Sequence, residues 1–317
     1  MGETGKDIEL AAKMLSDGGL VAIPTETVYG LAANALNERA VLNVFKVKQR
    51  PFFDPLIIHV SSISMAKRYA FFDDKRLLKL AKAFWPGPLT LLLPKKENVS
   101  DLITSGLPRV AIRVPKHSLT LRLINALDLP LAAPSANPFG YVSPTETAHV
   151  RKQLGDKIDY LLDGGSCKVG LESTIVGIEG EEICVFRLGG LPIEKIEGLV
   201  GSVKLCINTS DNPKVPGQLK SHYAPDKPLF IGNLSELIRL YSEKKIALIY
   251  FGEEKYDGRN LRLFNLSKTK MLDEAALNLF KFLRMADESD SDVVLCEKFP
   301  DEGLGRAIND RLMRASV

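Results

Sequence analysis

The chain has 317 residues, of which 45% are hydrophobic and 26% are charged. That composition is typical of a globular protein with a buried core, and at about 150 residues per domain the length predicts roughly two domains. The formal net charge of +3 excludes a broad electrostatic attraction to nucleic acid. Apolar runs are too short for a membrane span, and the opening segment MGETGKDIEL lacks signal-peptide features, so we expect a cytoplasmic protein without membrane contact.

The N-terminal part of the chain alternates helices and short strands. Apolar spacing predicts a helix over Ile8–Asp17 that ends at a Gly-Gly pair, then a buried strand over Leu20–Pro24 and a loop with the sequence TETVYG. A second helix around residues 41–45 cannot continue past Pro51, and Leu56–Val60 is again typical of a strand.

The middle of the chain continues this alternation irregularly. The further predicted strands are Leu89–Leu93, Val110–Val114, Leu129–Ala133, Tyr160–Leu162, Ser173–Ile178 and Ile183–Leu188. The predicted helices are Arg76–Phe84, Leu119–Leu127 and Thr145–Leu154. The fold class indicated is α/β, with a twisted mixed sheet covered by helices rather than a strictly parallel sheet.

Regular patterns lapse between about Gly201 and Pro228, where the stretch NTSDNPKVPGQLKSHYAPDKP carries four prolines and few large apolar residues. This composition predicts an interdomain linker. Strands are expected after it at Leu229–Ile231, Ile246–Phe251, Leu261–Leu266 and Val293–Cys296. Helices are expected at Leu234–Tyr241, Asp273–Met285 and Gly305–Arg314. The result is a small α/β domain of Rossmann-like pattern, without GxGxxG or a Walker loop, for which we expect a supporting or lid role.

Metal and nucleophile motifs are missing from the sequence. The cysteines form no CxxC pair and the histidines no HExxH, so we expect buried reduced thiols and no protein-ligated zinc. GxSxG is also missing, which leaves an α/β-hydrolase unsupported.

Four polar clusters instead stand near the ends of predicted strands, where α/β proteins bind ligands. The first is PTETVYGL at 24–31, and the second is KVKQRPFFDP, in which an extended turn would direct Lys46, Lys48 and Arg50 to one side as a phosphate cradle. Taken alone, the first is more typical of a structural turn, and the second is more typical of solvated surface lysines.

The third cluster is the stretch AAPSANPFGYVSPT at 132–145, which offers small polar side chains held by prolines. The fourth pairs GLESTIVG with VFRLGG, where a Gly-Gly turn is expected to leave Arg187 on a rim. A proline-rich connector and a solvated arginine are the plainer interpretations.

Taken together and in this order, the segments PTETVYGL, KQRP followed by PLIIHV, RVAIRVP, APSANPFG and ESTIV resemble the YrdC/Sua5 family of threonylcarbamoyl-AMP synthases over about residues 7–201. HYAP in the linker and the C-terminal GLGRAINDRLMRAS resemble the two-domain Sua5 form. The resemblance implies a YrdC-like catalytic domain at 1–201, a linker at 202–228 and a smaller Rossmann-like Sua5 domain at 229–317.

The activity implied by this resemblance joins L-threonine, bicarbonate or CO2, and ATP into L-threonylcarbamoyladenylate with release of pyrophosphate. A separate transferase complex then moves the threonylcarbamoyl group to adenosine 37 of tRNAs that read ANN codons, so tRNA would be an indirect partner. We expect Mg2+ to be carried by ATP, with no metal ligands from the protein.

The resemblance also implies site residues, with the family's KxR and SxN signatures falling on Lys48, Arg50, Ser135 and Asn137. For L-threonine it implies Thr27, His59, Arg113, Ala133 and Ser173. For ATP it implies Lys48, Arg50, Asp54, Arg109, Ser135, Asn137, Ser143, Arg187 and Tyr223.

Chemical reasoning gives these residues roles. A carbamate formed from threonine would attack the α-phosphorus of ATP, while Lys48 and Arg50, with Arg187, stabilise the developing charge. A linker that carries His222 and Tyr223 could fold over the ATP site as a gate, although a passive spacer is the simpler alternative.

Two positions depart from the family pattern: Asp54, where Asn is common, and Arg109, where Thr is common. We expect the guanidinium of Arg109 to compensate the carboxylate of Asp54.

Two other functions compete with this prediction. One is a non-catalytic protein that binds double-stranded RNA or tRNA, for which steep salt dependence would be expected. The other is a carbamoyl-transfer domain like those of hydrogenase-maturation proteins, which threonine dependence would separate from the synthase.

Overall fold

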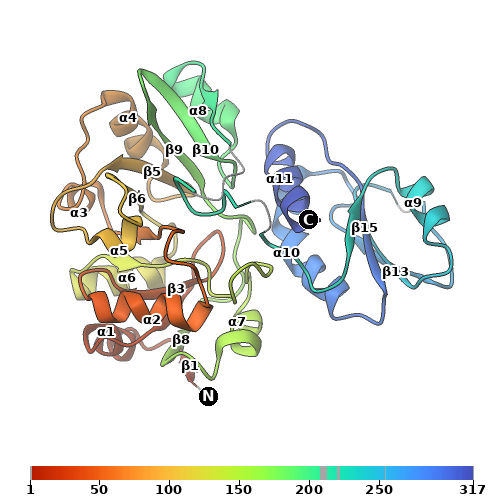
Figure 1. Cartoon of the computed structure of the whole chain (residues 1–317), viewed down its shortest axis with the longest axis horizontal. Helices are drawn as coiled ribbons and strands as arrows, with labels where there is room; N and C mark the ends of the chain where they lie inside the picture. Colours follow the sequence, from red (N-terminus) through yellow and green to blue (C-terminus); the bar gives the residue numbers. More distant parts are fainter. Residues whose placement is uncertain (1, 208–212, 220–221, 254, 317) are drawn as a thin grey trace.

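The computed structural model describes residues 2–207, 213–219, 222–253 and 255–316. The chain forms a larger N-terminal part, coloured red to green in Figure 1, beside a smaller blue C-terminal part. Each part has its own sheet, of eleven and four strands respectively among the described residues. The predicted α/β class, with a mixed sheet followed by a smaller Rossmann-like sheet, is confirmed.

The larger sheet has the strand order β1-β8-β2-β3-β7-β4-β6-β5-β9-β10-β11. The sheet is mixed, since it contains parallel pairs such as β4 with β6 and antiparallel pairs such as β9 with β10. Its strands are β1 (Glu3–Gly5), β2 (Val21–Ile23), β3 (Gly30–Asn34), β4 (Ile57–His59), β5 (Leu89–Pro94), β6 (Arg109–Arg113), β7 (Leu131–Ala132), β8 (Tyr160–Leu162), β9 (Thr174–Glu179), β10 (Glu182–Arg187) and β11 (Lys204–Leu205).

Local capping residues set where several helices of this part begin. The side chains of Asp7 and Asn37 accept hydrogen bonds from the first free backbone N–H groups of α1 and α2. Helix α2 ends at Lys48 and is capped by Gln49, whose backbone is left-handed, two residues before Pro51. The helices are α1 (Ile8–Ser16), α2 (Glu38–Lys48), α3 (Ile63–Ala66), α4 (Lys75–Phe84), α5 (Asp101–Thr104), α6 (Ser118–Leu127), α7 (Thr147–Leu154) and α8 (Ile193–Val200).

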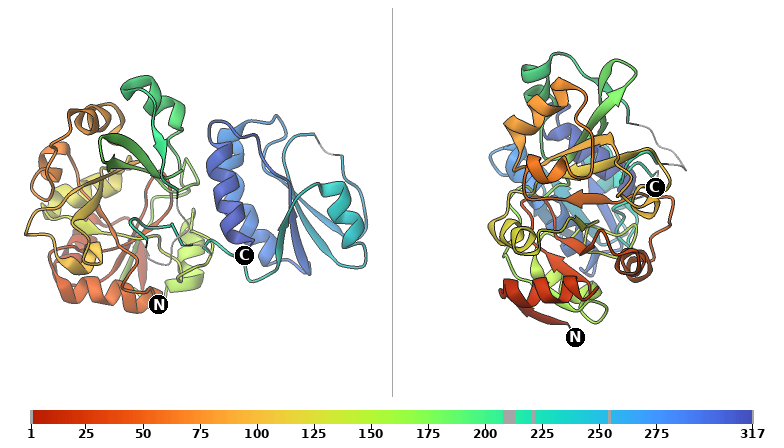
Figure 2. Two further views of the ribbon diagram at one scale, coloured as in Figure 1. Left: turned by 45° about the horizontal axis from the view of Figure 1, so that its top comes forward. Right: turned by 90° about the vertical axis from the view of Figure 1, so that its left-hand side faces the viewer.

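The C-terminal sheet is parallel throughout, in the order β12-β15-β13-β14. Two of its helices, α10 and α11, lie on the side that faces the N-terminal part, and α9 lies on the far side (Figures 1 and 2). The elements are β12 (Leu229–Ile231), α9 (Leu234–Leu240), β13 (Ile246–Tyr250), β14 (Leu261–Asn265), α10 (Leu272–Asp287), β15 (Val293–Cys296) and α11 (Gly305–Ala315).

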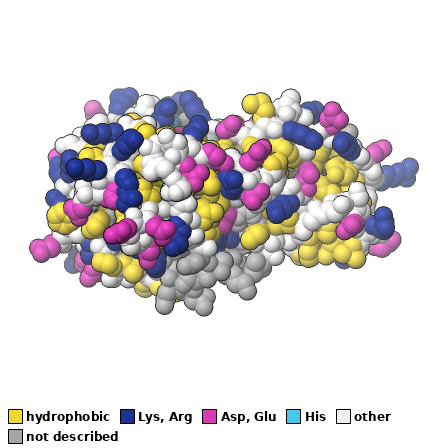
Figure 3. Space-filling model, turned by 90° about the horizontal axis from the view of Figure 1, so that it is seen from above, with side chains coloured by type: hydrophobic (Ala, Val, Ile, Leu, Met, Phe, Trp, Pro, Cys, Tyr) yellow, Lys and Arg dark blue, Asp and Glu magenta, His cyan; other side chains and the backbone are white. Residues whose placement is uncertain are grey.

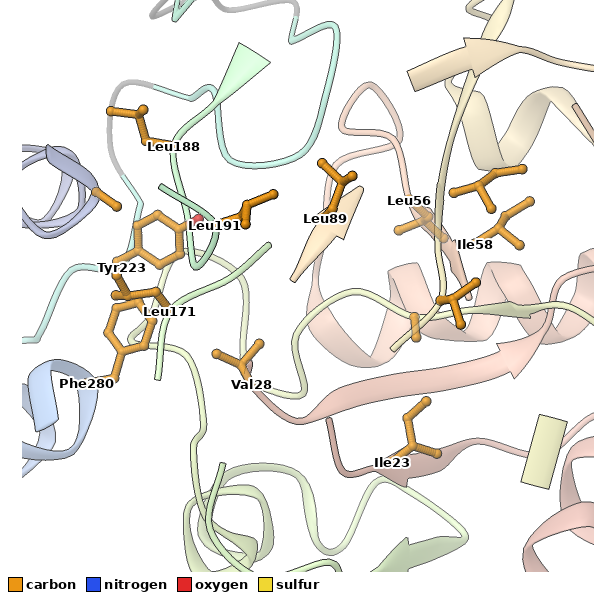
Figure 4. Packing of buried hydrophobic residues seen from close by; sticks show 14 of the residues in the cluster. Ile23, Val28, Leu56, Ile58, Leu89, Leu171, Leu188, Leu191, Tyr223 and Phe280 are labelled. Carbon is orange, nitrogen blue, oxygen red and sulfur yellow. The ribbon is translucent and has the colours of Figure 1, made fainter. Parts of the chain in front are cut away.

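One hydrophobic cluster joins the two parts. It runs from the larger core through Leu171 and Leu188 to Tyr223 and on to Phe280 of α10 (Figure 4). The rings of Tyr223 and Phe280 stack with centroids 5.6 Å apart. The C-terminal part is therefore packed against the N-terminal part through apolar contacts.

Several local predictions differ from the structure. Residues 46–48 belong to helix α2, so the turn is not extended, and Lys46 is exposed while Lys48 is buried. Strand β3 was not predicted, and the predicted strand Leu129–Ala133 shortens to the two residues of β7.

The predicted linker begins with β11, which pairs with β10, while residues 208–212 and 220–221 of it lie outside the described residues. The domain boundaries at 201 and 229 stay a prediction. Over the described part of the chain, the four cysteines are free thiols, and no helix is long and apolar enough to cross a membrane.

Candidate active site

A cavity of about 50 Å3 lies where four of the predicted polar clusters and the linker meet. It is lined by Thr25, Thr27, Val28, Gly30, Arg50, Ile57, His59, Arg113, Ala133, Pro134, Ser135, Glu172, Ser173, Arg187, Pro216, Gly217, His222 and Tyr223. These residues are separated in sequence, and the sheet brings them together.

The loop between β2 and β3 forms one wall of the cavity. The hydroxyl of Thr25 accepts hydrogen bonds from the backbone N–H groups of Thr27 and Val28 and donates to the carbonyl of Val28. This local turn holds the two threonine hydroxyls 2.8 Å apart inside the fold. The Thr27 hydroxyl is thereby fixed in the lining.

His59 and Arg113 stand side by side because β4 and β6 pair in parallel register at these two residues. The Arg113 guanidinium donates to the Thr27 hydroxyl at 2.8 Å and forms an ion pair with Glu26 at 2.7 Å. Burial, with the Arg113 charge beside it, lowers the pKa of His59 to about 3. A neutral imidazole therefore lies beside a buried cation in the cavity lining.

Arg187 ends strand β10, where a bulge shifts the register against β9. Its guanidinium donates to the Ser173 carbonyl at 2.8 Å and to the Ser173 hydroxyl at 3.1 Å, and also to the carbonyl of Pro216. Because a bulge turns side chains from the regular alternation, it accounts for the direction of this arginine. The prediction that Arg187 lies on a rim is wrong, since the residue is 4% exposed.

Arg50 contributes a third buried guanidinium. It is paired with Asp54 at 2.8 Å and donates to the carbonyls of Asp54 and Pro55. Burial raises the pKa of Asp54, and the nearby charges of Arg50, Lys48 and Arg187 oppose that rise. Asp54 itself does not line the cavity but neutralises part of the charge behind it.

Lys48 lies directly behind the loop that follows β7. Its ammonium donates to the backbone carbonyls of Ser135, at 2.5 Å, and Asn137. Burial lowers the pKa of this amine well below its ordinary value. Lys48 thus holds the loop whose Ala133 and Ser135 line the cavity.

Two further predicted site residues lie outside the cavity lining. The amide of Asn137 donates to the carbonyls of Pro138 and Tyr141, and the Ser143 hydroxyl donates to Glu172 at 2.5 Å. Both side chains brace the loop from within the fold.

The linker closes the cavity. Pro216, Gly217, His222 and Tyr223 all line it, and the His222 ring packs edge-on to Tyr223 with centroids 4.1 Å apart. Burial lowers the pKa of His222 well below its ordinary value and raises that of Tyr223 to about 12, so both rings are neutral.

Arg109 was predicted to be a site residue, but it does not line the cavity. Its guanidinium donates to the Ile178 carbonyl at 2.8 Å, pairs with Glu179 at 3.3 Å and lies over the Phe186 ring. The expectation that it compensates Asp54 is wrong, because Arg50 does so. β6 carries Arg109 at one end and Arg113 at the other, which separates them by the length of the strand.

Sequence reasoning missed Glu172, Pro216 and Gly217 as lining residues. Glu172 adjoins Ser173 in the quoted ESTIV segment, and that adjacency was the available signal. Over the described residues, no group of three or more His, Cys, Asp or Glu side chains could hold a metal ion.

Comparison with known proteins agrees with this architecture. Residues 13–189 match the Sua5/YciO/YrdC family model, described as telomere recombination, and residues 191–317 match the model of the threonylcarbamoyl-AMP synthase C-terminal domain. Threonylcarbamoyl-AMP synthase of Pyrococcus abyssi is 41% identical, with 98% of this chain and 94% of the relative covered. The Bacillus subtilis protein of the same name is 38% identical, with 98% and 92% covered.

A solved structure shows the same fold across both parts. The crystal structure of P. abyssi Sua5 complexed with L-threonine matches with a TM-score of 0.92 and 39% identity, covering 100% of this chain and 97% of that one. The chain therefore belongs to the two-domain Sua5 family of threonylcarbamoyl-AMP synthases.

Proposed function

We propose that this protein is an L-threonylcarbamoyladenylate synthase, which converts L-threonine, bicarbonate or CO2, and ATP into threonylcarbamoyl-AMP and pyrophosphate. The observation that carries the proposal is the convergence of three buried guanidinium groups, Arg50, Arg113 and Arg187, on one cavity together with the hydroxyls of Thr27 and Ser173. Such a cavity suits a ligand that combines a carboxylate, a hydroxyl and phosphates.

The amino-acid end of the site is proposed around Arg113. Its guanidinium has N–H groups beyond those given to Thr27, Glu26 and Gly87, and a carboxylate of L-threonine would receive them. The proposed threonine contacts are Thr27, His59, Arg113, Ala133 and Ser173. In P. abyssi Sua5, L-threonine is the ligand named with the crystal structure.

The phosphate end is proposed around Arg50 and Arg187, with Ser135 and Tyr223 beside them. Four residues would support the site from outside the lining, through the contacts described above: Lys48, Asp54, Asn137 and Ser143. Arg109 would not contribute to substrate binding. Mg2+ would enter as a component of the ATP substrate, since Asp54 is already paired with Arg50 and surrounded by cations.

The reaction needs no protein nucleophile. The amine of threonine forms an N–C bond to CO2 and loses a proton, which gives a carbamate. A carbamate oxygen then attacks the α-phosphorus as the bond from that phosphorus to the pyrophosphate oxygen breaks. Arg50 and Arg187 would stabilise the charge that develops on the phosphoryl group and on the leaving pyrophosphate.

The linker would act as a gate. A cavity of about 50 Å3 is far below the roughly 300–1,000 Å3 of ordinary ligand sites, and linker residues supply part of its wall. ATP can therefore enter only if Pro216, Gly217, His222 and Tyr223 move. Movement of these residues would expose the arginines to a triphosphate.

The product would pass to a transferase complex that modifies adenosine 37 of tRNA in the cytoplasm. Direct RNA binding as the main function has less support. Basic and acidic side chains are interspersed over the face drawn in Figure 3, and the net charge is +3.

Pyrophosphate release by the purified protein tests the proposal. With ATP, Mg2+ and bicarbonate present, we expect release only when L-threonine is added, together with the mass of the adenylate in the trapped product. Arg50→Ala serves as the impaired control. Release that is independent of threonine would favour the carbamoyl-transfer alternative, and salt-dependent RNA binding without any release would favour the RNA-binding one.

A further inference from the structure

The C-terminal domain contributes a fully buried arginine to the back of the cavity wall. Arg311 of α11 is 0% exposed. Its Nε donates to Glu172 Oε2 at 2.8 Å, its Nη2 donates to the carbonyl of Leu188 at 2.8 Å, and its guanidinium lies 4.9 Å over the Tyr223 ring. Arg311 therefore contacts two residues of the catalytic domain and one of the linker at the same time.

Glu172 makes this contact significant because it is an acid that lines the cavity. Its other oxygen, Oε1, accepts the hydrogen bond of the Ser143 hydroxyl at 2.5 Å. The side chain is buried, so water screens its charge little. A carboxylate in that position would repel the phosphates of ATP unless a cation neutralised it.

Arg311 is the cation placed to neutralise the Glu172 carboxylate, and the neighbouring charged groups have other partners. Asp310, which also pairs with Arg311, has a second partner in Arg314 at 3.0 Å. Arg187 lies on the cavity side, where its N–H groups are given to Ser173 and Pro216. Arg311 is thus the guanidinium with a direct bond to the Glu172 carboxylate among the described residues.

We propose that Arg311 is a positioning residue for the ATP site, which neutralises Glu172 so that the cavity, once the linker has moved, accepts polyphosphate. This inference rests on the proposed function, because it takes ATP as the ligand. It assigns the C-terminal domain a part in substrate binding rather than only a supporting role. Arg311 acts through Glu172 and touches no reacting atom.

A double-mutant cycle between Glu172 and Arg311 tests the proposal in the full-length protein. Arg311→Met should raise the dissociation constant of ATP, and its KM, by about tenfold, within the usual range of coupling between sites. The KM for threonine should change by less than about threefold, since Arg113 is untouched. Glu172→Gln combined with Arg311→Met should bind ATP more tightly than Arg311→Met alone, because no unpaired carboxylate remains.

Arg306→Ala is the matched control. Arg306 lies on the same helix and also pairs with a glutamate of the catalytic domain, Glu194 of α8, but this pair is partly exposed. We expect its ATP affinity to equal that of the wild type. Loss of ATP affinity in this variant, as large as in Arg311→Met, would overturn the proposal, since any interdomain pair would then suffice.

Two further outcomes decide the matter, and the first of them is available even if Arg311→Met alone does not fold. In the Glu172→Gln background, removal of Arg311 should cost less than about threefold in ATP affinity, and a tenfold cost there would overturn the neutralising role. Unchanged ATP binding in a folded Arg311→Met would also overturn it. Because ATP binding is measured directly by calorimetry, a failure of the synthase reaction in the wild type is a separate result.

Discussion

Arg50 and Arg109 carry the same charge in different surroundings, and we expect their removal to have different effects. Arg50 is buried in the cavity lining, whereas Arg109 pairs with Glu179 at a partly exposed strand end. Arg50→Ala should lower turnover about a hundredfold or more, the usual scale for the loss of one charge-stabilising donor. Arg109→Ala should keep turnover within about twofold. Steady-state pyrophosphate release measures both, and equal losses would show that Arg109 also serves the reaction.

The buried imidazole of His59 should make the protein less stable as the pH falls. Its pKa is lowered to about 3 in the folded protein, while the unfolded chain takes up this proton near pH 6.5. The stabilising contribution of the neutral ring is therefore complete above about pH 6.5 and is lost toward pH 3, at roughly 1.4 kcal/mol per pH unit.

Denaturant unfolding at pH 7 and pH 5 measures this effect in the wild type and in His59→Asn. The free energy of unfolding should fall by about 2 kcal/mol more in the wild type than in the variant between the two pH values. The pKa values of His117, His149 and His222 are also lowered, but all three residues are retained in the variant, so their contributions cancel in the comparison. Equal pH dependence in the two proteins would contradict the assignment.

The sequence predicts which residues line the cavity better than it predicts how deeply their side chains are buried. Most of the implied lining residues do line the cavity, because they lie in motifs at strand ends. Arg187 and Lys48 were expected to be accessible, and both are buried by contacts that depend on a register bulge and on a distant loop. Arg311 shares the apolar face of α11 with Ile308 and Leu312, and that placement was the one signal of a buried charge.

At the scale of elements, the long apolar strands were the easiest to predict. β13 is a continuous apolar run, and β5 is apolar except for Thr90, so neither needs a partner to be recognised. β3, with the sequence GLAAN, has small residues and little intrinsic strand preference, so only its pairing with β2 and β7 makes it a strand. β1 and β11 are likewise short edge strands that depend on their neighbours.

The loop between β10 and α8 depends on a glycine at position 189. A Cβ added there would lie 2.2 Å from the carbonyl oxygen of Glu172 and 2.5 Å from the carbonyl carbon of Ser173, so the two segments could not pack as they do. Gly189→Ala should lower the free energy of unfolding by about 1–3 kcal/mol and should also reduce turnover, because it displaces Ser173.

Gly198→Ala provides the matched comparison for that variant. Gly198 lies in α8, and a Cβ there would meet nothing within 4 Å. Alanine at this position should raise the free energy of unfolding by up to about 1 kcal/mol with unchanged turnover. Denaturant titrations and the pyrophosphate assay measure both variants. A Gly189→Ala protein as stable and active as the Gly198→Ala protein would show that the loop can relax.

On the scale of the whole molecule, the two domains are joined more closely than a linker alone would require. The core cluster continues from Leu171 through Tyr223 to Phe280, and Arg284 of α10 donates to the carbonyls of Val142 and Ser143. Domain interfaces within a chain are usually polar and permit relative motion. Sequence patterns predicted the two sheets but not this junction, because its contacts join residues far apart in the chain.

This junction should make the two domains unfold together. The single tryptophan, Trp85, lies in the N-terminal domain, so its fluorescence reports on that domain alone. Phe280→Ala, in the C-terminal domain, removes a buried ring that stacks on Tyr223 and should lower the free energy of unfolding by about 3–5 kcal/mol. If unfolding is cooperative, the Trp85 transition and the far-ultraviolet circular dichroism transition coincide in the wild type and shift together in the variant. A Trp85 transition that stays in place while the helical signal shifts would mean that the domains unfold independently, and the linker would then be their only effective connection.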